Sequence, residues 1–115
     1  MTITINHITF DCADAAALAA FWSGVVGQPV DDGASADFAT ITSPTAVSWM
    51  FVKVPEAKQV KNRVHVDLGA DDLAAELDRI VALGASQLGD HDEFGARWTT
   101  LADPEGNEFD VVQAG

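Results

Sequence analysis

The sequence predicts an α+β fold made of two βαβββ modules, which together would form a cupped mixed β-sheet with the helices on its outer face. The prediction rests on a repeat. A strand-like segment with a histidine runs into an alanine-rich helical segment that ends at glycine, and this order occurs twice. His7 precedes Gly27 by 20 positions, and His65 precedes Gly84 by 19 positions. The 115 residues are therefore expected to form a single domain, with module one at about 1–56 and module two at about 62–115.

The first strand and helix of module one follow from hydrophobic periodicity. Residues 3–11 alternate between apolar and polar side chains, which predicts a strand. Asp14 is expected to cap the helix, and Gly27 to end it. The predicted buried stripe has the i, i+3, i+4, i+7 spacing of a helix and comprises Leu18, Phe21, Trp22 and Val25.

The rest of module one is predicted to be extended. Two strands are expected at residues 36–42 and 47–54, joined by a turn at Ser43 and Pro44. Residues 55–62 read as a polar connector that carries lysines.

Module two is expected to open with a strand at residues 63–68. Asp71 or Asp72 would cap the following helix, which Gly84 would end. The predicted buried stripe of this helix comprises Leu73, Leu77, Ile80 and Val81.

Turn residues divide the remainder of module two. A short strand is expected at residues 85–88, an acidic loop at 89–95 and a strand at 97–101. Residues 103–106, with the sequence Asp-Pro-Glu-Gly, predict a tight turn, since proline fixes φ and glycine permits positive φ. The last strand is predicted at 108–113.

Composition excludes several classes of function. The net charge is −12, with only six lysine and arginine residues, so the chain lacks the cations that bind phosphates or an anionic membrane surface. We therefore expect no nucleic-acid and no membrane partner. The acidic surface could attract cationic ligands, or it could serve solubility alone. The single cysteine, Cys12, fits a reducing compartment, and a cytoplasmic location is expected.

Several motifs together resemble the vicinal oxygen chelate superfamily, which includes glyoxalase I, extradiol dioxygenases, fosfomycin-resistance enzymes and bleomycin-binding proteins. The resemblance spans the chain and looks closest to a small glyoxalase-like branch. It implies a cavity for a small organic molecule and a homodimer. The motifs are Asn6-His7-Ile8-Thr9, Ala20-Phe21-Trp22 with Gly27, Lys61-Asn62-Arg63-Val64-His65-Val66-Asp67-Leu68, Leu83-Gly84-Ala85 and Asp103-Pro104-Glu105-Gly106-Asn107-Glu108-Phe109.

The resemblance also implies metal ligands on the first and last strands of each repeat. Those positions are His7, His65 and Asp110, whereas the matching position in the first repeat, Val52, cannot bind a metal. Two histidines and one carboxylate equal the ligand set of non-haem iron oxygenases and would also suit a catalytic zinc ion. The candidate cofactor is therefore a divalent metal: Fe, Zn, Mn or Ni. The alternative is that both histidines line a cavity in a protein that has lost its metal.

Other residues could carry function. Glu108 and Asp67 are candidates for proton transfer, although Asp67 could instead pair with Arg63 on the surface. Trp49 and Trp98 could line a ligand cavity, or they could belong to the core or a dimer interface. The remaining polar candidates are Arg97, as a clamp for a ligand or a surface ion pair, and His91, as part of a solvated loop.

Two functions stay open on the sequence. One is a metal-dependent lyase, isomerase or dioxygenase that uses His7, His65 and Asp110. The other is a binding protein without metal, similar to the drug-sequestering members of the superfamily, with an acidic, aromatic-lined groove for a cationic or flat ligand.

Overall fold

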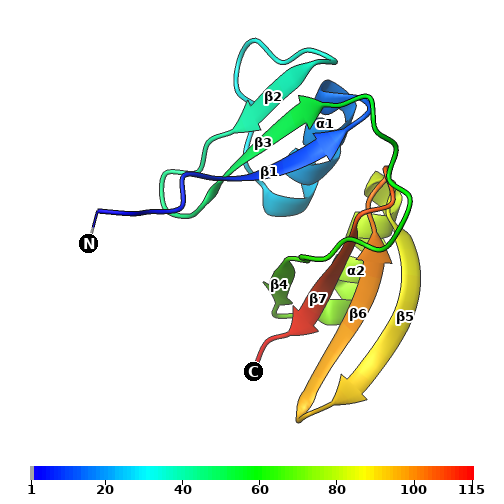
Figure 1. Ribbon diagram of the computed structural model, residues 1–115. Coiled ribbons are helices and arrows are strands. Elements are labelled where there is room, and N and C mark those ends of the chain that lie inside the picture. Colours follow the sequence, from blue (N-terminus) through cyan, green and yellow to red (C-terminus); the bar gives the residue numbers. More distant parts are fainter. Residues whose placement is uncertain (1) are drawn as a thin grey trace. The chain divides into compact units, whose positions relative to one another are not determined.

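The computed structural model describes residues 2–115, which fall into two compact units that divide between Ala57 and Lys58 (Figure 1). Each unit has its own mixed sheet and one helix, so the predicted α+β class is confirmed. Neither helix within the described range is long and apolar enough to cross a membrane.

The first unit contains three strands and a helix among its described residues. They are β1 (His7–Cys12), α1 (Ala15–Val26), β2 (Phe38–Ile41) and β3 (Ser48–Lys53). The sheet order is β1-β3-β2, with β1 parallel and β2 antiparallel to β3. The predicted first strand thus begins at His7 rather than at Ile3, and this unit has one strand fewer than a full βαβββ module.

Helix α1 follows the sequence prediction closely. The Asp14 side chain accepts a hydrogen bond from the backbone N–H of Ala17 at 3.1 Å, and Gly27 ends the helix with a φ of 72°. All four residues of the predicted stripe are buried: Leu18, Phe21, Trp22 and Val25. The helix covers one face of the sheet (Figure 1). On the other face, the polar side chains of His7, Thr9 and Asp11 in β1 are exposed.

The second unit contains the complete βαβββ order. Its elements are β4 (Asp67–Ala70), α2 (Leu73–Leu83), β5 (Ser86–Glu93), β6 (Ala96–Ala102) and β7 (Glu108–Gln113). The sheet order is β4-β7-β6-β5, and β4 runs parallel to β7. Asp72, rather than Asp71, caps α2 by accepting from the backbone N–H of Ala75 at 3.1 Å.

Three expectations for this unit are wrong. Its first strand covers Asp67–Ala70 rather than residues 63–68. Residues 89–95 are not an acidic loop, because β5 continues to Glu93 and pairs with β6 along its length. The predicted helix stripe is also too wide, since Leu73 and Ile80 are buried but Val81 is 41% exposed. A register shift between Gln87 and Gly89 marks a β-bulge in β5.

The turn before β7 has the predicted chemistry. The carboxylate of Asp103, only 3% exposed, accepts hydrogen bonds from the backbone N–H groups of Glu105 and Asn107. Gly106 has a φ of 88°, which glycine adopts without strain. This turn leads into β7, the strand that carries Asp110.

Candidate functional site

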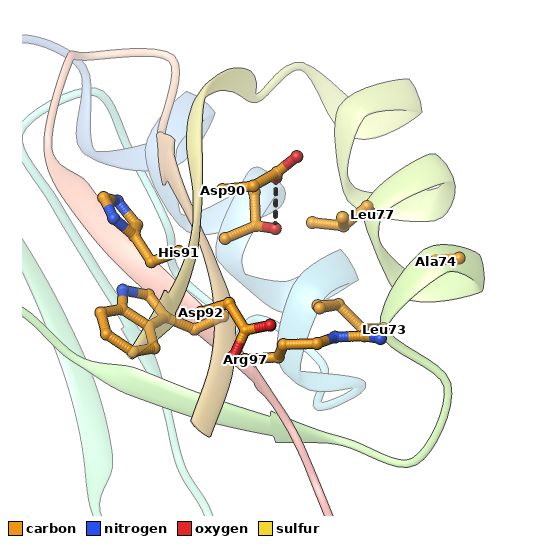
Figure 2. A pocket seen from close by; sticks show the side chains of 9 residues that line it. Leu73, Ala74, Leu77, Asp90, His91, Asp92 and Arg97 are labelled. Atoms are coloured by element: carbon orange, nitrogen blue, oxygen red, sulfur yellow. Dashed lines mark hydrogen bonds between the residues drawn. The ribbon is translucent and has the colours of Figure 1, made fainter. Parts of the chain in front are cut away.

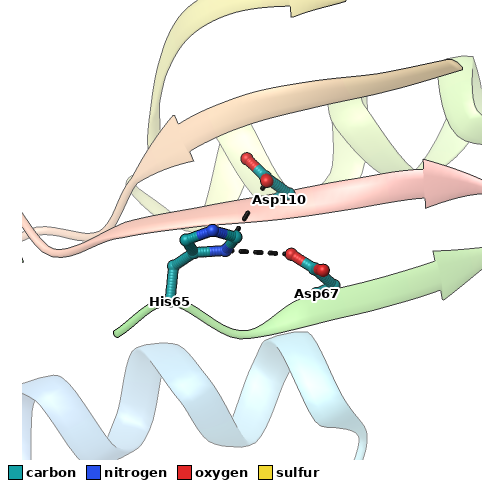
Figure 3. A group of neighbouring side chains, drawn as sticks. All are labelled: His65, Asp67 and Asp110. Carbon is teal, nitrogen blue, oxygen red and sulfur yellow. Dashed lines mark hydrogen bonds and ion pairs between the residues drawn. The ribbon is translucent and has the colours of Figure 1, made fainter. Parts of the chain in front are cut away.

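Three polar side chains converge on the second unit. The Nδ1 atom of His65 lies 3.0 Å from Oδ1 of Asp67 and 3.6 Å from Oδ2 of Asp110 (Figure 3). His65 precedes β4, and the parallel register places Asp67 of β4 directly beside Asp110 of β7. The structure thus brings together two of the three predicted metal ligands and adds Asp67, a residue expected to transfer protons.

This cluster fits a divalent metal ion in spacing and donor type. One ligand atom from each of His65, Asp67 and Asp110 can be chosen so that all lie within 4.8 Å of one another. Ligand atoms about 2.0–2.2 Å from one ion are roughly 3–4 Å apart. One imidazole nitrogen with carboxylate oxygens suits Mn, Fe, Zn or Ni. Side-chain exposures of 43% for His65 and 16% for Asp110 leave the cluster accessible to solvent.

Thr100 orients the carboxylate of Asp110. Its hydroxyl donates to Oδ1 of Asp110 at 2.6 Å, so Oδ2 is the oxygen that faces His65. Hydrogen bonds of this kind fix the orientation of metal ligands. Sequence reasoning missed Thr100, although the alternation along β6 places it on the opposite face from the buried residues Thr99 and Leu101.

Glu108 is held by the chain that precedes β4. Asn62 donates its backbone N–H to Oε2 of Glu108 at 3.2 Å and accepts from the Glu108 backbone N–H at 2.8 Å. Burial raises the pKa of the Glu108 carboxyl, but this Asn62 hydrogen bond and the charges of Lys58 and Lys61 more than offset it, so its pKa lies below the ordinary value. Glu108 is therefore a carboxylate tied to structure, which is a poor starting point for a general acid.

His7 begins β1 on the exposed face of the first unit's sheet, and its role as a metal ligand stays a prediction. In the first unit, strand pairing makes Met50, rather than the predicted Val52, the position that corresponds to Asp110. Asp67 pairs with Asp110, whereas its counterpart Thr9 pairs with Met50 rather than with Val52. Neither Met50 nor Val52 offers a carboxylate, so the first unit has no equivalent of Asp110.

Trp49 belongs to the core of the first unit. It is 9% exposed and stacks on Trp22 of α1, with ring centroids 5.3 Å apart and an interplanar angle of 18°. It therefore faces the helix rather than the open side of the sheet, and this packing supports the core interpretation over the ligand-cavity interpretation.

Arg97 and Trp98 line a cavity of about 320 Å³ beside β5, β6 and α2 (Figure 2). Leu73 and Leu77 supply apolar surface on the helix side. His91 stacks on Trp98 with ring centroids 5.1 Å apart, so it is part of a paired strand and not of a solvated loop. The other residues of the lining are Ala74, Asp90, Asp92 and Thr99.

Comparison with protein families identifies the fold. The family model of the glyoxalase-like domain matches residues 7–112. No curated protein sequence gives a significant match.

Solved structures are similar over nearly the whole chain. A glyoxalase/bleomycin resistance protein/dioxygenase family enzyme from Burkholderia phytofirmans PsJN is 16% identical, with a TM-score of 0.80 over 96% of this chain and 98% of that one. The fosfomycin resistance protein FosX from Listeria monocytogenes is 14% identical, with a TM-score of 0.78 over 100% and 96% of the two chains. Its E126Q mutant, complexed with Mn(II) and 1S,2S-dihydroxypropylphosphonic acid, is 12% identical, with a TM-score of 0.79 over 100% and 92%. At these identities the likeness concerns the fold.

Proposed function

We propose, from the premise that the chain belongs to the glyoxalase-like domain family, that it binds a divalent metal and acts on a small organic molecule with neighbouring oxygen atoms. The two units would work as one domain. The reaction class would be that of a lyase, an isomerase or a dioxygenase, and the protein would be a cytoplasmic homodimer.

The observation that carries the proposal is the cluster of His65, Asp67 and Asp110, whose donor atoms lie within 4.8 Å of one another. A FosX mutant with the same fold is complexed with Mn(II), which supports metal binding by a protein of this fold. His7 is proposed as a further ligand, supplied by the same chain or by a second copy. A bound metal would polarise the oxygen atoms of a chelating substrate as a Lewis acid.

Residues of the chain would orient the metal ligands and transfer protons to or from the bound molecule. The hydroxyl of Thr100 holds Asp110 in one orientation. Asp67 shares a hydrogen bond with His65 at 3.0 Å and is 58% exposed, so it can reach a bound molecule. With His65 and Asp110 as the metal ligands, Asp67 would be the better candidate for proton transfer than Glu108, which is engaged by Asn62.

Metal titration tests this function. Chelator-free protein would be titrated calorimetrically with Mn²⁺, Fe²⁺, Zn²⁺ and Ni²⁺, and the H65A and D110A variants compared with the wild type. We expect one tight site that both substitutions abolish. H91A, which changes a histidine outside the cluster, is the matched control and should bind as the wild type does. Absence of binding to the wild type, or unchanged binding to H65A and D110A, would overturn the proposal.

A binding role without metal is the second candidate, and the cavity beside Arg97 and Trp98 favours it. A cationic or flat ligand could enter this acidic, partly aromatic pocket, as in sequestration of a drug. Quenching of tryptophan fluorescence by a cationic glycopeptide or a planar drug, in metal-free protein, would support this role. Loss of the response in W98F would locate the ligand.

A further inference from the structure

The hairpin between β5 and β6 projects beyond the rest of its sheet. Pairing of β5 with β6 continues to Glu93 and Ala96, whereas pairing of β6 with β7 begins only at Trp98. The two residues of the turn, Phe94 and Gly95, have φ angles of 55° and 77°. We call residues 92–95 the hairpin tip.

Phe94 is an unusual residue for this position. Two-residue turns with positive φ at both positions favour Asn-Gly or Asp-Gly, because a bulky side chain is strained there. Phe94 is nevertheless 94% exposed, so its ring gains nothing from the unit that holds it. A strained backbone and an exposed aromatic ring at the same residue indicate a contact outside the unit.

The other end of the sheet carries complementary chemistry. Residues 60–64, which we call the connector patch, expose Val60 by 75% and Val64 by 82%. Lys61 and Arg63 are exposed between them. The hairpin tip, in contrast, exposes the carboxylates of Asp92 and Glu93 beside Phe94.

The two patches lie too far apart to meet within the unit. Asn62 of the connector patch is hydrogen-bonded to Glu108, which pairs with Ala102 at the end of β6. The hairpin tip adjoins Ala96, at the start of the same strand. Seven residues of strand separate them, which corresponds to about 20 Å.

We propose that the hairpin tip of one copy docks on the connector patch of a second copy, and that the exchange is reciprocal in a two-fold symmetric dimer. Charge complementarity selects this occupant. The connector patch holds two of the chain's six cationic residues, Lys61 and Arg63, and no acidic residue, so the acidic hairpin tip of another copy can bind there without repulsion. Because each copy has both patches, two-fold symmetry satisfies both contacts at once.

Sedimentation equilibrium of the full chain tests the role of Phe94. Wild-type protein is expected to form dimers, and F94N is expected to raise the dimer dissociation constant by about tenfold or more. Asparagine suits the left-handed turn, so F94N should keep or improve the thermal stability of the monomer. A wild type that stays monomeric at high concentration, or an F94N dimer as tight as the wild type, would overturn the proposal.

Charge reversal tests the pairing of the two patches. D92K/E93K alone and K61E/R63E alone should each be monomeric, because each dimer would then oppose like charges. A mixture of the two variants should form heterodimers, since every contact regains an opposite partner. Failure of the mixture to associate, or dimers of either variant alone, would contradict a tip-to-connector contact. Dimerisation that persists in all variants would place the interface elsewhere.

Discussion

The two units share a β-sheet plan but differ in what their faces hold. The helix-facing side of the first unit is a cluster of aromatic rings, in which Phe10, Trp22 and Trp49 have centroids 5.2–5.9 Å apart. The corresponding side of the second unit is mainly aliphatic, with Phe109 as its fully buried aromatic residue among those described. The sheet faces that the helices do not cover also differ, because that of the second unit holds the cluster of His65, Asp67 and Asp110.

The difference shows how a repeated module can divide its tasks. Equivalent register positions hold Met50 in the first unit and Asp110 in the second, and the adjacent threonines are Thr40 and Thr100. The Thr100 hydroxyl donates to Asp110, whereas the Thr40 hydroxyl donates to Asp31. The same strand pairing thus places a half-buried methionine at this position in one unit and a carboxylate of the candidate site in the other.

The largest effect should come from the aromatic core of the first unit. W22A removes a side chain that is fully buried and contacts three other aromatic rings, so the free energy of unfolding should fall by about 3–5 kcal/mol. Chemical denaturation measures this. V81A, at a position 41% exposed, is the control and should change the value by about 0.5 kcal/mol or less. A loss near that of the control would mean that the aromatic cluster contributes little.

Substituting Asp110 by methionine, the residue at the equivalent position of the first unit, should abolish the difference in metal binding between the two units. D110M places the residue of the first unit into the second, and it should weaken metal binding at least about a hundredfold, because a ligand is lost. The reverse substitution, M50D, should leave the affinity of the site unchanged. Calorimetric titration measures both, and tight binding by D110M would exclude Asp110 as a ligand.

The hydroxyl of Thr100 should contribute less than the ligand it orients. T100V removes the donor to Asp110, and metal affinity should fall about 10- to 100-fold. T40V is the matched control, since it changes the equivalent threonine of the first unit. Equal affinities for T100V and wild type would limit Thr100 to a structural role.

The smallest effect concerns pH in the first unit. Hydrogen bonds from the Thr40 and Thr42 hydroxyls lower the pKa of the Asp31 carboxyl below its ordinary value. Asp31 therefore stabilises the fold above about pH 4, and this contribution is lost as the pH falls through the lowered pKa of the folded state. A T40V/T42V variant should raise the Asp31 pKa in an NMR titration, whereas T100V should not. An unchanged pKa in the double variant would refute the assignment.

Local signals allowed much of the fold to be predicted. Both helix caps and both terminal glycines follow from the short-range chemistry of aspartate and glycine. The extent of β5 could not be predicted, because its residues are polar and exposed and its pairing with β6 is a tertiary property. Residues such as Asp92 and Glu93 read as a loop in isolation.

The candidate site was accessible to prediction where alternation alone decides which face a residue occupies. Alternation gave the face of His65, Asp67 and Asp110, whereas the expectation that His65 and Asp110 bind a metal came from the resemblance to the superfamily. The pairing of Thr100 with Asp110, and the equivalence of Met50 to Asp110, follow from strand register. The spacing of the sequence repeat gives this register only to within two residues, since it pointed to Val52. The burial of Trp49 similarly depends on which face α1 covers.

The bulge in β5 has a consequence for the sidedness of the hairpin. Gln87 pairs with Leu101, yet Gly89 pairs with Thr100, so Leu88 is the extra residue that resets the alternation. Because of this one insertion, His91 shares a face with Trp98, and Asp90 turns to the side of α2. If the same residues paired regularly without the bulge, Asp90 would lie opposite Trp98, and His91 would lie opposite Arg97 on the side of α2. Carboxylates would then lie against the indole, and the imidazole would be directed at the leucines of the helix.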